Sequence, residues 1–207
     1  MTRTLQAATP TLILASASTA RAAMLEAAGL AFEVVPAPVD EVELRVALRA
    51  EGCDSLDAAT ALAELKAQHV AARTEGDRIV LGADQLLECD GLWLEKPADR
   101  AAARAQLGRL GGRAHRLVSA VVAFRGGARV WHHVAGAEIT LRALSPEFIE
   151  AYLDAAGEAA QRSVGAYELE GLGAQLVKDV RGDHFTVLGL PLLPLLQFLR
   201  DQGVLLA

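Results

Sequence analysis

Three acidic residues could act as catalytic or metal-binding carboxylates. Asp84 follows an apolar run at residues 79–83 that ends in Gly-Ala and is predicted to be a buried strand. A carboxylate at the carboxyl end of such a strand lies where open α/β sheets bind their ligands. Asp40 and Glu41 follow a proline-containing segment outside predicted regular structure. With Asp84 they could hold a hard divalent cation through oxygen ligands, although alone they would indicate a surface turn.

A second group of residues could bind an anion. Residues 14–21 read as a strand end, a turn of small residues and a helix start, and they include Ser16, Ser18 and Arg21. Free backbone N–H groups and the helix dipole suit a phosphate there. Arg21 would add a planar fork of donors. An ordinary serine cap followed by a solvated arginine is the alternative interpretation.

Two lysines are further candidates for binding an anion. Lys66 is predicted to lie on a helix, near the edge of its apolar face. Most helical lysines are simply solvated, so its position alone is weak evidence. Lys96 precedes Pro97, which favours an extended backbone close to a predicted hairpin.

Composition limits the classes of protein and of ligand. The chain has 207 residues, is 52% apolar and carries a formal net charge of −6. Its length suits one large domain, or two lobes that share a core, and its apolar content excludes disorder. The acidic balance argues against a nucleic-acid polymer as partner. An anionic ligand would therefore need a local cluster of cations or a metal ion.

The cysteines and the apolar segments indicate a cytoplasmic protein. Cys53 and Cys89 form no C-x-x-C pair, suit a reducing compartment and read as buried small hydrophobes. The first ten residues lack the apolar region of a signal peptide. The most apolar tract, residues 187–199, contains glycine and proline and is shorter than the ~20 residues of a membrane span.

The predicted elements favour a mixed α/β fold. Strand and helix patterns alternate early, and two long antiparallel strands, joined at Gly126-Gly127, follow in the middle of the chain. Strands are expected at residues 11–15, 32–35, 79–82, 114–124, 128–141 and 175–180, and helices at 19–28, 56–73, 98–110, from 145 and at 192–202. Residues 40–54 read as irregular helix, residues 85–94 as a hairpin turning at Asp90-Gly91, and residues 165–173 as a glycine-rich connection.

Several common catalytic sites are absent from the sequence. It contains no G-x-x-x-x-G-K-[ST] phosphate loop and no G-x-S-x-G nucleophile elbow. His132 and His133 are adjacent on a predicted strand, so their side chains point to opposite faces and do not chelate one zinc ion easily.

Six short motifs, in order, resemble the Maf family of nucleotide pyrophosphatases, which is related in fold to inosine triphosphatases. No single motif is specific for the family, but the six motifs in this order are, and together they cover nearly the whole chain. The motifs are Leu14-Ala15-Ser16-Ala17-Ser18-Thr19-Ala20-Arg21, Val39-Asp40-Glu41, Leu62-Ala63-Glu64-Leu65-Lys66-Ala67, Gly82-Ala83-Asp84-Gln85 with Lys96-Pro97, Gly165 through Glu170-Gly171, and Leu188-Gly189-Leu190-Pro191.

The resemblance implies metal-dependent hydrolysis of a nucleoside triphosphate to the monophosphate and pyrophosphate. Asp84 would be the catalytic carboxylate, which activates a water or holds the metal that does so, and Glu41 would assist the metal (Mg²⁺, Mn²⁺ or Co²⁺). The triphosphate would be bound by Ser16, Arg21, Lys66 and Lys96. The expected fold is a single domain over residues 1–207 with a mixed, partly antiparallel, twisted sheet flanked by helices. A division of this domain into two lobes around a central cleft is left open as an alternative.

Three positions bear on the base. Family members that act on dTTP and UTP typically have arginine, threonine and glutamine at the positions that Ala20, Gln85 and Glu170 occupy in this chain. Gln85 and Glu170 instead resemble the branch that acts on 7-methyl-GTP, and a carboxylate can accept from the N1 and N2 donors of guanine. That branch usually has an aromatic residue where Ala20 lies, so the base stays open, with dTTP and UTP disfavoured.

Other functions and the assembly state also remain open. The family's association with septum formation suggests a nucleotide-binding regulator of cell division with little turnover as the alternative. A phosphatase that releases single phosphates is a third possibility. The resemblance also implies a homodimer.

Overall fold

The structure is a computed structural model that describes residues 5–206. The chain divides into two compact units. Unit 1 comprises the described residues up to Gln85, the segment Ser119–Ala135 and the described residues from Gly189 onward. Unit 2 comprises Leu86–Val118 and Gly136–Leu188. Whether they act as one domain stays a prediction.

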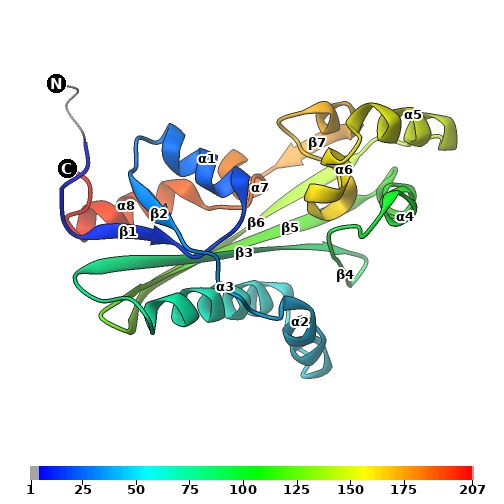
Figure 1. Cartoon of the computed structure of the whole chain (residues 1–207). Coiled ribbons are helices and arrows are strands. Elements are labelled where there is room, and N and C mark those ends of the chain that lie inside the picture. The colour runs from blue at the N-terminus through cyan, green and yellow to red at the C-terminus, as the bar shows by residue number, and fades with distance from the viewer. Residues whose placement is uncertain (1–4, 207) are drawn as a thin grey trace. The chain divides into compact units, whose positions relative to one another are not determined.

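Strands and helices alternate at the start of the chain, and consecutive strands and consecutive helices follow (Figure 1). The strands are β1 (Thr11–Leu14), β2 (Phe32–Val34), β3 (Arg78–Cys89), β4 (Leu92–Leu94), β5 (Ala114–Arg125), β6 (Ala128–Leu141) and β7 (Val177–Arg181). The α-helices are α1 (Thr19–Ala27), α2 (Glu41–Ala50), α3 (Ser55–Ala71), α4 (Arg100–Leu110), α5 (Pro146–Ala156), α6 (Ala159–Arg162), α7 (His184–Val187) and α8 (Leu192–Asp201). Two 3₁₀ helices are η1 (Val164–Ala166) and η2 (Leu172–Leu176).

The strands form a seven-stranded mixed sheet in the order β2-β1-β3-β5-β6-β7, with β4 paired to β3. β1 is parallel to both β2 and β3, whereas the pairs β3–β4 and β6–β7 are antiparallel. The predicted mixed, partly antiparallel α/β fold is therefore confirmed.

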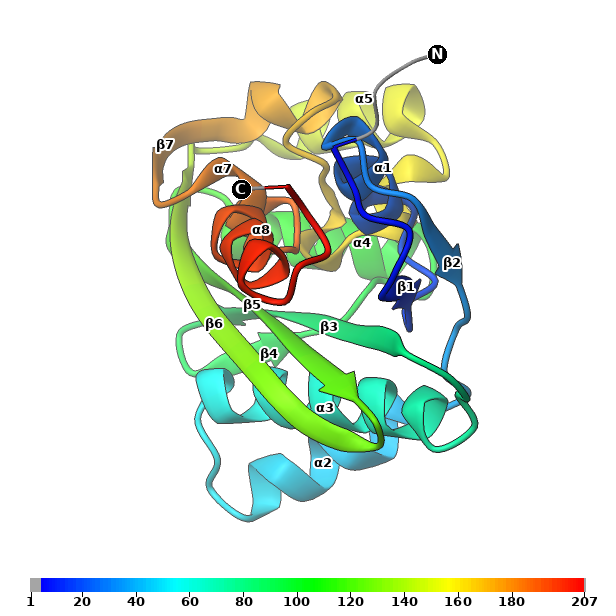
Figure 2. The ribbon, with the colours of Figure 1, turned by 90° about the vertical axis from the view of Figure 1, so that its left-hand side faces the viewer.

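In unit 1, helices cover both faces of the strands. Figures 1 and 2 show α2 and α3 on one face and α1 and α8 on the other. The buried side of α3 repeats every three or four residues, as an amphipathic helix requires. This stripe consists of Ser55, Ala58, Ala59, Leu62, Ala63, Lys66, Ala67, Val70 and Ala71. Most of its members are small, so α3 can lie close to the strand that it covers.

In unit 2, an apolar cluster forms around α4, α5 and the strand segments of this unit. A polar contact is buried within it. The Nε2 atom of His115 lies 2.7 Å from the hydroxyl oxygen of Tyr167. Tyr152 donates a hydrogen bond from its hydroxyl to the carbonyl of Ala166, which follows Gly165. Both tyrosines therefore anchor the glycine-rich connection of residues 165–173 to the core of the unit.

Most helices begin at a side chain that accepts a backbone N–H. Asp54 accepts from Leu56 and Asp57 at the start of α3, and Ser145 caps α5. Asp40 does the same for α2, because its Oδ1 accepts from the backbone N–H of Glu43 at 3.0 Å. Asp40 itself lies outside the helix, as expected, whereas Glu41 is the first residue of α2, which corrects the expectation that Glu41 lies outside regular structure.

Three other expectations also differ from the structure. Residues 41–50 form a regular helix, α2, and not an irregular one: Asp40 caps it, and Glu41 and Glu43 in its first turn favour a helix start. The connection at residues 165–173 contains two short 3₁₀ segments. Cys89 is buried as expected, whereas Cys53 is half-buried at the end of α2.

In the described part of the chain, no helix is long and apolar enough to cross a membrane.

Candidate active site

Asp84 lies within β3 and not at its end. β3 continues through Asp84 to Cys89, which corrects the expectation drawn from the Gly-Ala pair. The strand that ends here is β1, whose last register pair joins Leu14 to Leu81. The N–H of Ala15 makes one more bond to the carbonyl of Leu81 at 2.8 Å, and the chain then turns into α1. Asp84 therefore lies just beyond the carboxyl end of β1, where the parallel pairing stops.

Gly82 explains how α3 can approach this strand. A Cβ atom on Gly82 would lie 2.1 Å from the carbonyl oxygen of Ala63 and 2.6 Å from the backbone nitrogen of Ala67. Residues two apart on a strand face the same side, so Asp84 faces α3 as well. Lys66 lies between those two alanines in the buried stripe of α3. The absence of a side chain at Gly82 thus lets Lys66 reach Asp84.

Lys66 and Arg45 each face two carboxylates. The Nζ atom of Lys66 lies 2.6 Å from Oδ1 of Asp84 and 2.7 Å from Oε1 of Glu41. Nη2 of Arg45 lies 2.9 Å from Oε2 of Glu41 and 3.6 Å from Oδ2 of Asp84. We call these four residues the charged cluster. The exposed fraction of the Asp84 side chain is 4% and that of the Lys66 side chain 9%, so solvent screens this pair weakly.

The charged cluster lowers the pKa of Glu41 but leaves some buried atoms without hydrogen-bond partners. Burial by itself would raise the pKa of Glu41, but Lys66, Arg45 and Arg21 lower it below its usual value. Among the described residues, Oδ2 of Asp84 and Nε of Arg45 are buried and have no hydrogen-bond partner. An orphaned buried carboxylate oxygen is costly, and it indicates a place for a ligand atom.

Arg21 is buried beside the charged cluster. Its Nη1 donates to Oγ of Ser16 and to the carbonyl of Ala83, both at 3.0 Å, and its Nε donates to the carbonyl of Gly189 at 2.8 Å. Burial lowers the pKa of Arg21, an effect that the charges of Asp84 and Glu41 oppose. The alternative of a solvated arginine is therefore wrong, while Ser18 caps α1 as that alternative expected.

The side chain of Gln85 has a hydrogen-bond partner within unit 1. Its Nε2 donates to the hydroxyl of Ser119 on β5 at 3.1 Å, and the Ser119 side chain is fully buried. A Cβ atom on Gly189 would lie 3.6 Å from Oε1 of Gln85. Ala20 is half-buried in the first turn of α1. The amide of Gln85 thus lies near Gly189, whose carbonyl also accepts a hydrogen bond from Arg21.

The other two predicted residues belong to unit 2. Lys96 is exposed in the segment between β4 and α4. Glu170 is exposed in the turn that the N–H of Gly171 closes onto the carbonyl of Glu168 at 3.2 Å. Unit 1 brings Ser16, Arg21, Glu41, Lys66 and Asp84 together, whereas the roles of Lys96 and Glu170 remain predictions.

Arg45 is a cluster residue that sequence reasoning missed. It follows Glu41 by four residues on α2, a spacing at which opposite charges pair on a helix. That spacing was a usable signal, but it requires α2 to be a regular helix.

The donor set of the charged cluster fits a hard divalent cation. Glu41 and Asp84 offer carboxylate oxygens, the ligands that Mg²⁺ and Mn²⁺ prefer, and one of these oxygens is the orphaned Oδ2. Across residues 5–206 no group of three or more His, Cys, Asp or Glu could hold a metal. A metal here would therefore complete its shell with water and substrate oxygens, as Mg²⁺ does at phosphate sites.

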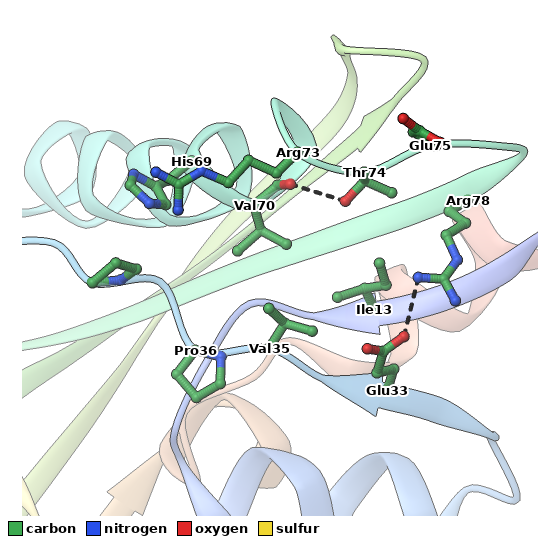
Figure 3. A pocket seen from close by; sticks show the side chains of 11 residues that line it. Ile13, Glu33, Val35, Pro36, His69, Val70, Arg73, Thr74, Glu75 and Arg78 are labelled. Carbon is green, nitrogen blue, oxygen red and sulfur yellow. Dashed lines mark hydrogen bonds and ion pairs between the residues drawn. The ribbon is translucent and has the colours of Figure 1, made fainter.

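A separate hollow of about 230 Å³ lies in unit 1 between β1, β2 and the end of α3 (Figure 3). Ile13, Val35 and Val70 contribute apolar side chains to it, and Arg78 pairs with Glu33 at its rim at 3.0 Å. No residue of the charged cluster lines it.

Comparisons with known proteins show the family of the chain. The "Maf-like protein" family model matches residues 11–202. A relative named "Nucleoside triphosphate pyrophosphatase" from Paramagnetospirillum magneticum is 57% identical over 93% of this chain and 99% of its own. One named "7-methyl-GTP pyrophosphatase" from Rhizobium meliloti is 48% identical over 95% and 98%. A solved dITP/XTP pyrophosphatase from Mycobacterium abscessus shares 18% identity, with a TM-score of 0.42 over 94% of each chain. The chain belongs to the Maf-like protein family.

Proposed function

We propose that this protein hydrolyses nucleoside triphosphates to the monophosphate and pyrophosphate. The observation that carries the proposal is the charged cluster, in which Lys66 and Arg45 face Asp84 and Oδ2 of Asp84 is orphaned. The buried Arg21 lies beside this cluster and adds a third positive charge. Such a site can take a polyanion and also accept a proton or a metal ion. The names of the similar proteins support the same reaction.

In the proposed reaction, a water oxygen bonds to a phosphorus atom of the α–β anhydride and the bond from that phosphorus to the bridging oxygen breaks. Oδ2 of Asp84 is the oxygen available for this step, because Lys66 already occupies Oδ1. It would either accept the proton of the water or hold the metal that activates this water, in which case the proton passes to solvent. Lys66 and Arg21 would neutralise the charge that develops on the phosphate oxygens. Ser16, whose Oγ accepts from Arg21, still has its own proton to donate to a phosphate.

Glu41 and Asp84 would hold the divalent metal. Bound there, the metal would polarise the phosphate oxygens and lower the pKa of a coordinated water. Lys96 is proposed as a further triphosphate-binding residue.

For the base, we propose a non-standard or modified nucleotide of the 7-methyl-GTP type over dTTP or UTP. The amide of Gln85, oriented by Ser119, and the carboxylate of Glu170 would contact the base, and Ala20 would leave space beside it. Guanine presents donors that a carboxylate can accept. A relative at 48% identity carries the corresponding name.

The test is product analysis with Mg²⁺, Mn²⁺ or Co²⁺ across a panel of nucleotides. We expect monophosphate and pyrophosphate in equal amounts, and a fall in kcat of about 10²-fold or more in Asp84→Asn, the range of a lost general base. Asp57→Asn, the same change at an exposed position in the first turn of α3, is the matched control. Free phosphate as product, or tight binding without any turnover, would contradict the proposal. A cytoplasmic homodimer remains a prediction from the resemblance, which fractionation and analytical ultracentrifugation would check.

A further inference from the structure

Arg45 is held differently from Lys66, although both face the same two carboxylates. Lys66 makes two short contacts, of 2.6 and 2.7 Å. Arg45 makes one short contact to Glu41 and stays 3.6 Å from Oδ2 of Asp84. Its Nε is buried without a partner in the described structure. A guanidinium that leaves both its own donor and the facing oxygen unsatisfied is not an optimised structural pair.

The helix that carries Arg45 is the least anchored in the site. α2 contains no buried residue. Segments with little buried apolar surface open and shift at low free-energy cost. Glu41 and Arg45 can therefore move with the start of α2, whereas Lys66 and Asp84 belong to the buried contact between α3 and β3.

The cationic side chains of the site compete with a metal ion for the two carboxylates. Arg21, Arg45 and Lys66 contribute three positive charges against two negative charges from Glu41 and Asp84. A divalent cation added to the free protein would enter a region that is already cationic. A nucleoside triphosphate brings negative charge that offsets this surplus and also offers Arg45 a bidentate partner.

From these observations we propose that Arg45 is an exchangeable positioning residue. In the nucleotide-free protein it occupies the space between Glu41 and Asp84 and keeps a divalent metal out. When the nucleotide arrives, Arg45 turns to its phosphates and frees Oδ2 of Asp84 for the metal. The inference rests on the proposed function, because it assigns the site to a nucleotide and a metal.

The first experiment measures Mn²⁺ binding to the nucleotide-free protein, by the electron paramagnetic resonance signal of free Mn²⁺. We expect weak binding to the wild-type protein and about 5-fold or tighter binding to Arg45→Met and Arg45→Gln. Arg45→Lys, which keeps the charge, should stay near the wild type. Arg49→Gln on the exposed part of α2 is the matched control and should change nothing.

The second experiment measures affinity for a non-hydrolysable α,β-methylene triphosphate in EDTA. The two neutral variants should bind it about 5-fold or more weakly, so that metal and nucleotide affinity move in opposite directions. A purely structural role would weaken both. Unchanged or weaker Mn²⁺ binding in both folded neutral variants, checked by circular dichroism, would overturn the proposal. Neither titration needs turnover, so a lack of pyrophosphate release would contradict the proposed reaction without deciding the role of Arg45.

Discussion

Lys66 of α3 and Asp84 of β3 form a buried ion pair, with 2.6 Å between Nζ and Oδ1. The pair exists because Gly82 brings the backbones of α3 and β3 together. Burial makes the pair sensitive to the loss of either partner, since an unpaired charge in the interior is costly. The same contact thus serves the fold and the proposed chemistry.

Replacing Lys66 by Met should lower the free energy of unfolding by about 3 kcal/mol, because Asp84 would keep only the distant contact to Arg45. Asp84→Asn should cost less, since Lys66 retains Glu41. The double variant should be more stable than the sum of the single changes predicts, by about 1 kcal/mol or more. Urea unfolding measures all three, with exposed Lys178→Met as control. Additivity within about 0.5 kcal/mol would show that the two side chains are not coupled.

Gly82→Ala should be strongly destabilising, because its Cβ would meet the backbone of α3 at 2.1 and 2.6 Å. Overpacking of this kind costs about 1–3 kcal/mol and sometimes more. Gly108→Ala in α4 is the matched control: nothing lies within 4 Å of its Cβ, and a helical alanine should stabilise by about 1 kcal/mol. Thermal unfolding compares the two. Equal melting temperatures for both variants would contradict the close approach of α3 and β3.

His115 should make unit 2 sensitive to acid. Burial lowers its pKa from 6.5 to about 4. Between these values the unfolded chain binds a proton that the folded chain does not, so stability is complete above pH 6.5 and falls as the pH drops toward 4. The loss should reach about 3 kcal/mol. His115→Gln, which can keep the hydrogen bond to Tyr167, should remove this part of the pH dependence, whereas exposed His132→Gln should not. Unfolding curves at pH 7.5 and pH 5 provide the comparison.

Ser119→Ala should alter the choice of nucleotide more than the rate of the chemical step. The amide of Gln85 would lose one of its fixed partners, while the charged cluster would stay intact. We expect the ratio of kcat/KM for 7-methyl-GTP and GTP to change by about 3-fold or more, mainly through KM. Thr60→Ala, which removes a hydroxyl bonded to Leu56 on α3, is the control. An equal loss for every nucleotide, carried by kcat, would argue against a role for Gln85 in base selection.

Local patterns predicted most of the fold. The capping side chains Asp54 and Ser145, the hairpin turn at Asp90-Gly91 and the Gly126-Gly127 connection all lie where their residue types indicate. These features depend on neighbours in the sequence, so short-range rules are sufficient for them.

Long-range contacts explain what sequence reasoning got wrong. Gly82 looked like the end of a strand, but it marks a close backbone approach within one. The alternative of a solvated Arg21 could not be excluded from the sequence, because its acceptors, Ala83 and Gly189, lie far along the chain. Lys66 reads as one more helical lysine until its place in the buried stripe of α3 is considered.

The hydrogen bond from Arg21 to Gly189 has a consequence for biosynthesis. The two residues are 168 positions apart. At about 5–20 residues per second, a ribosome needs roughly 8 to 30 seconds to pass from one to the other. During that time Arg21 lacks this acceptor, while every residue of unit 2 is translated, since that unit ends at Leu188. The hydrogen bonds of Arg21 are therefore completed only after the newly made chain already contains all of unit 2.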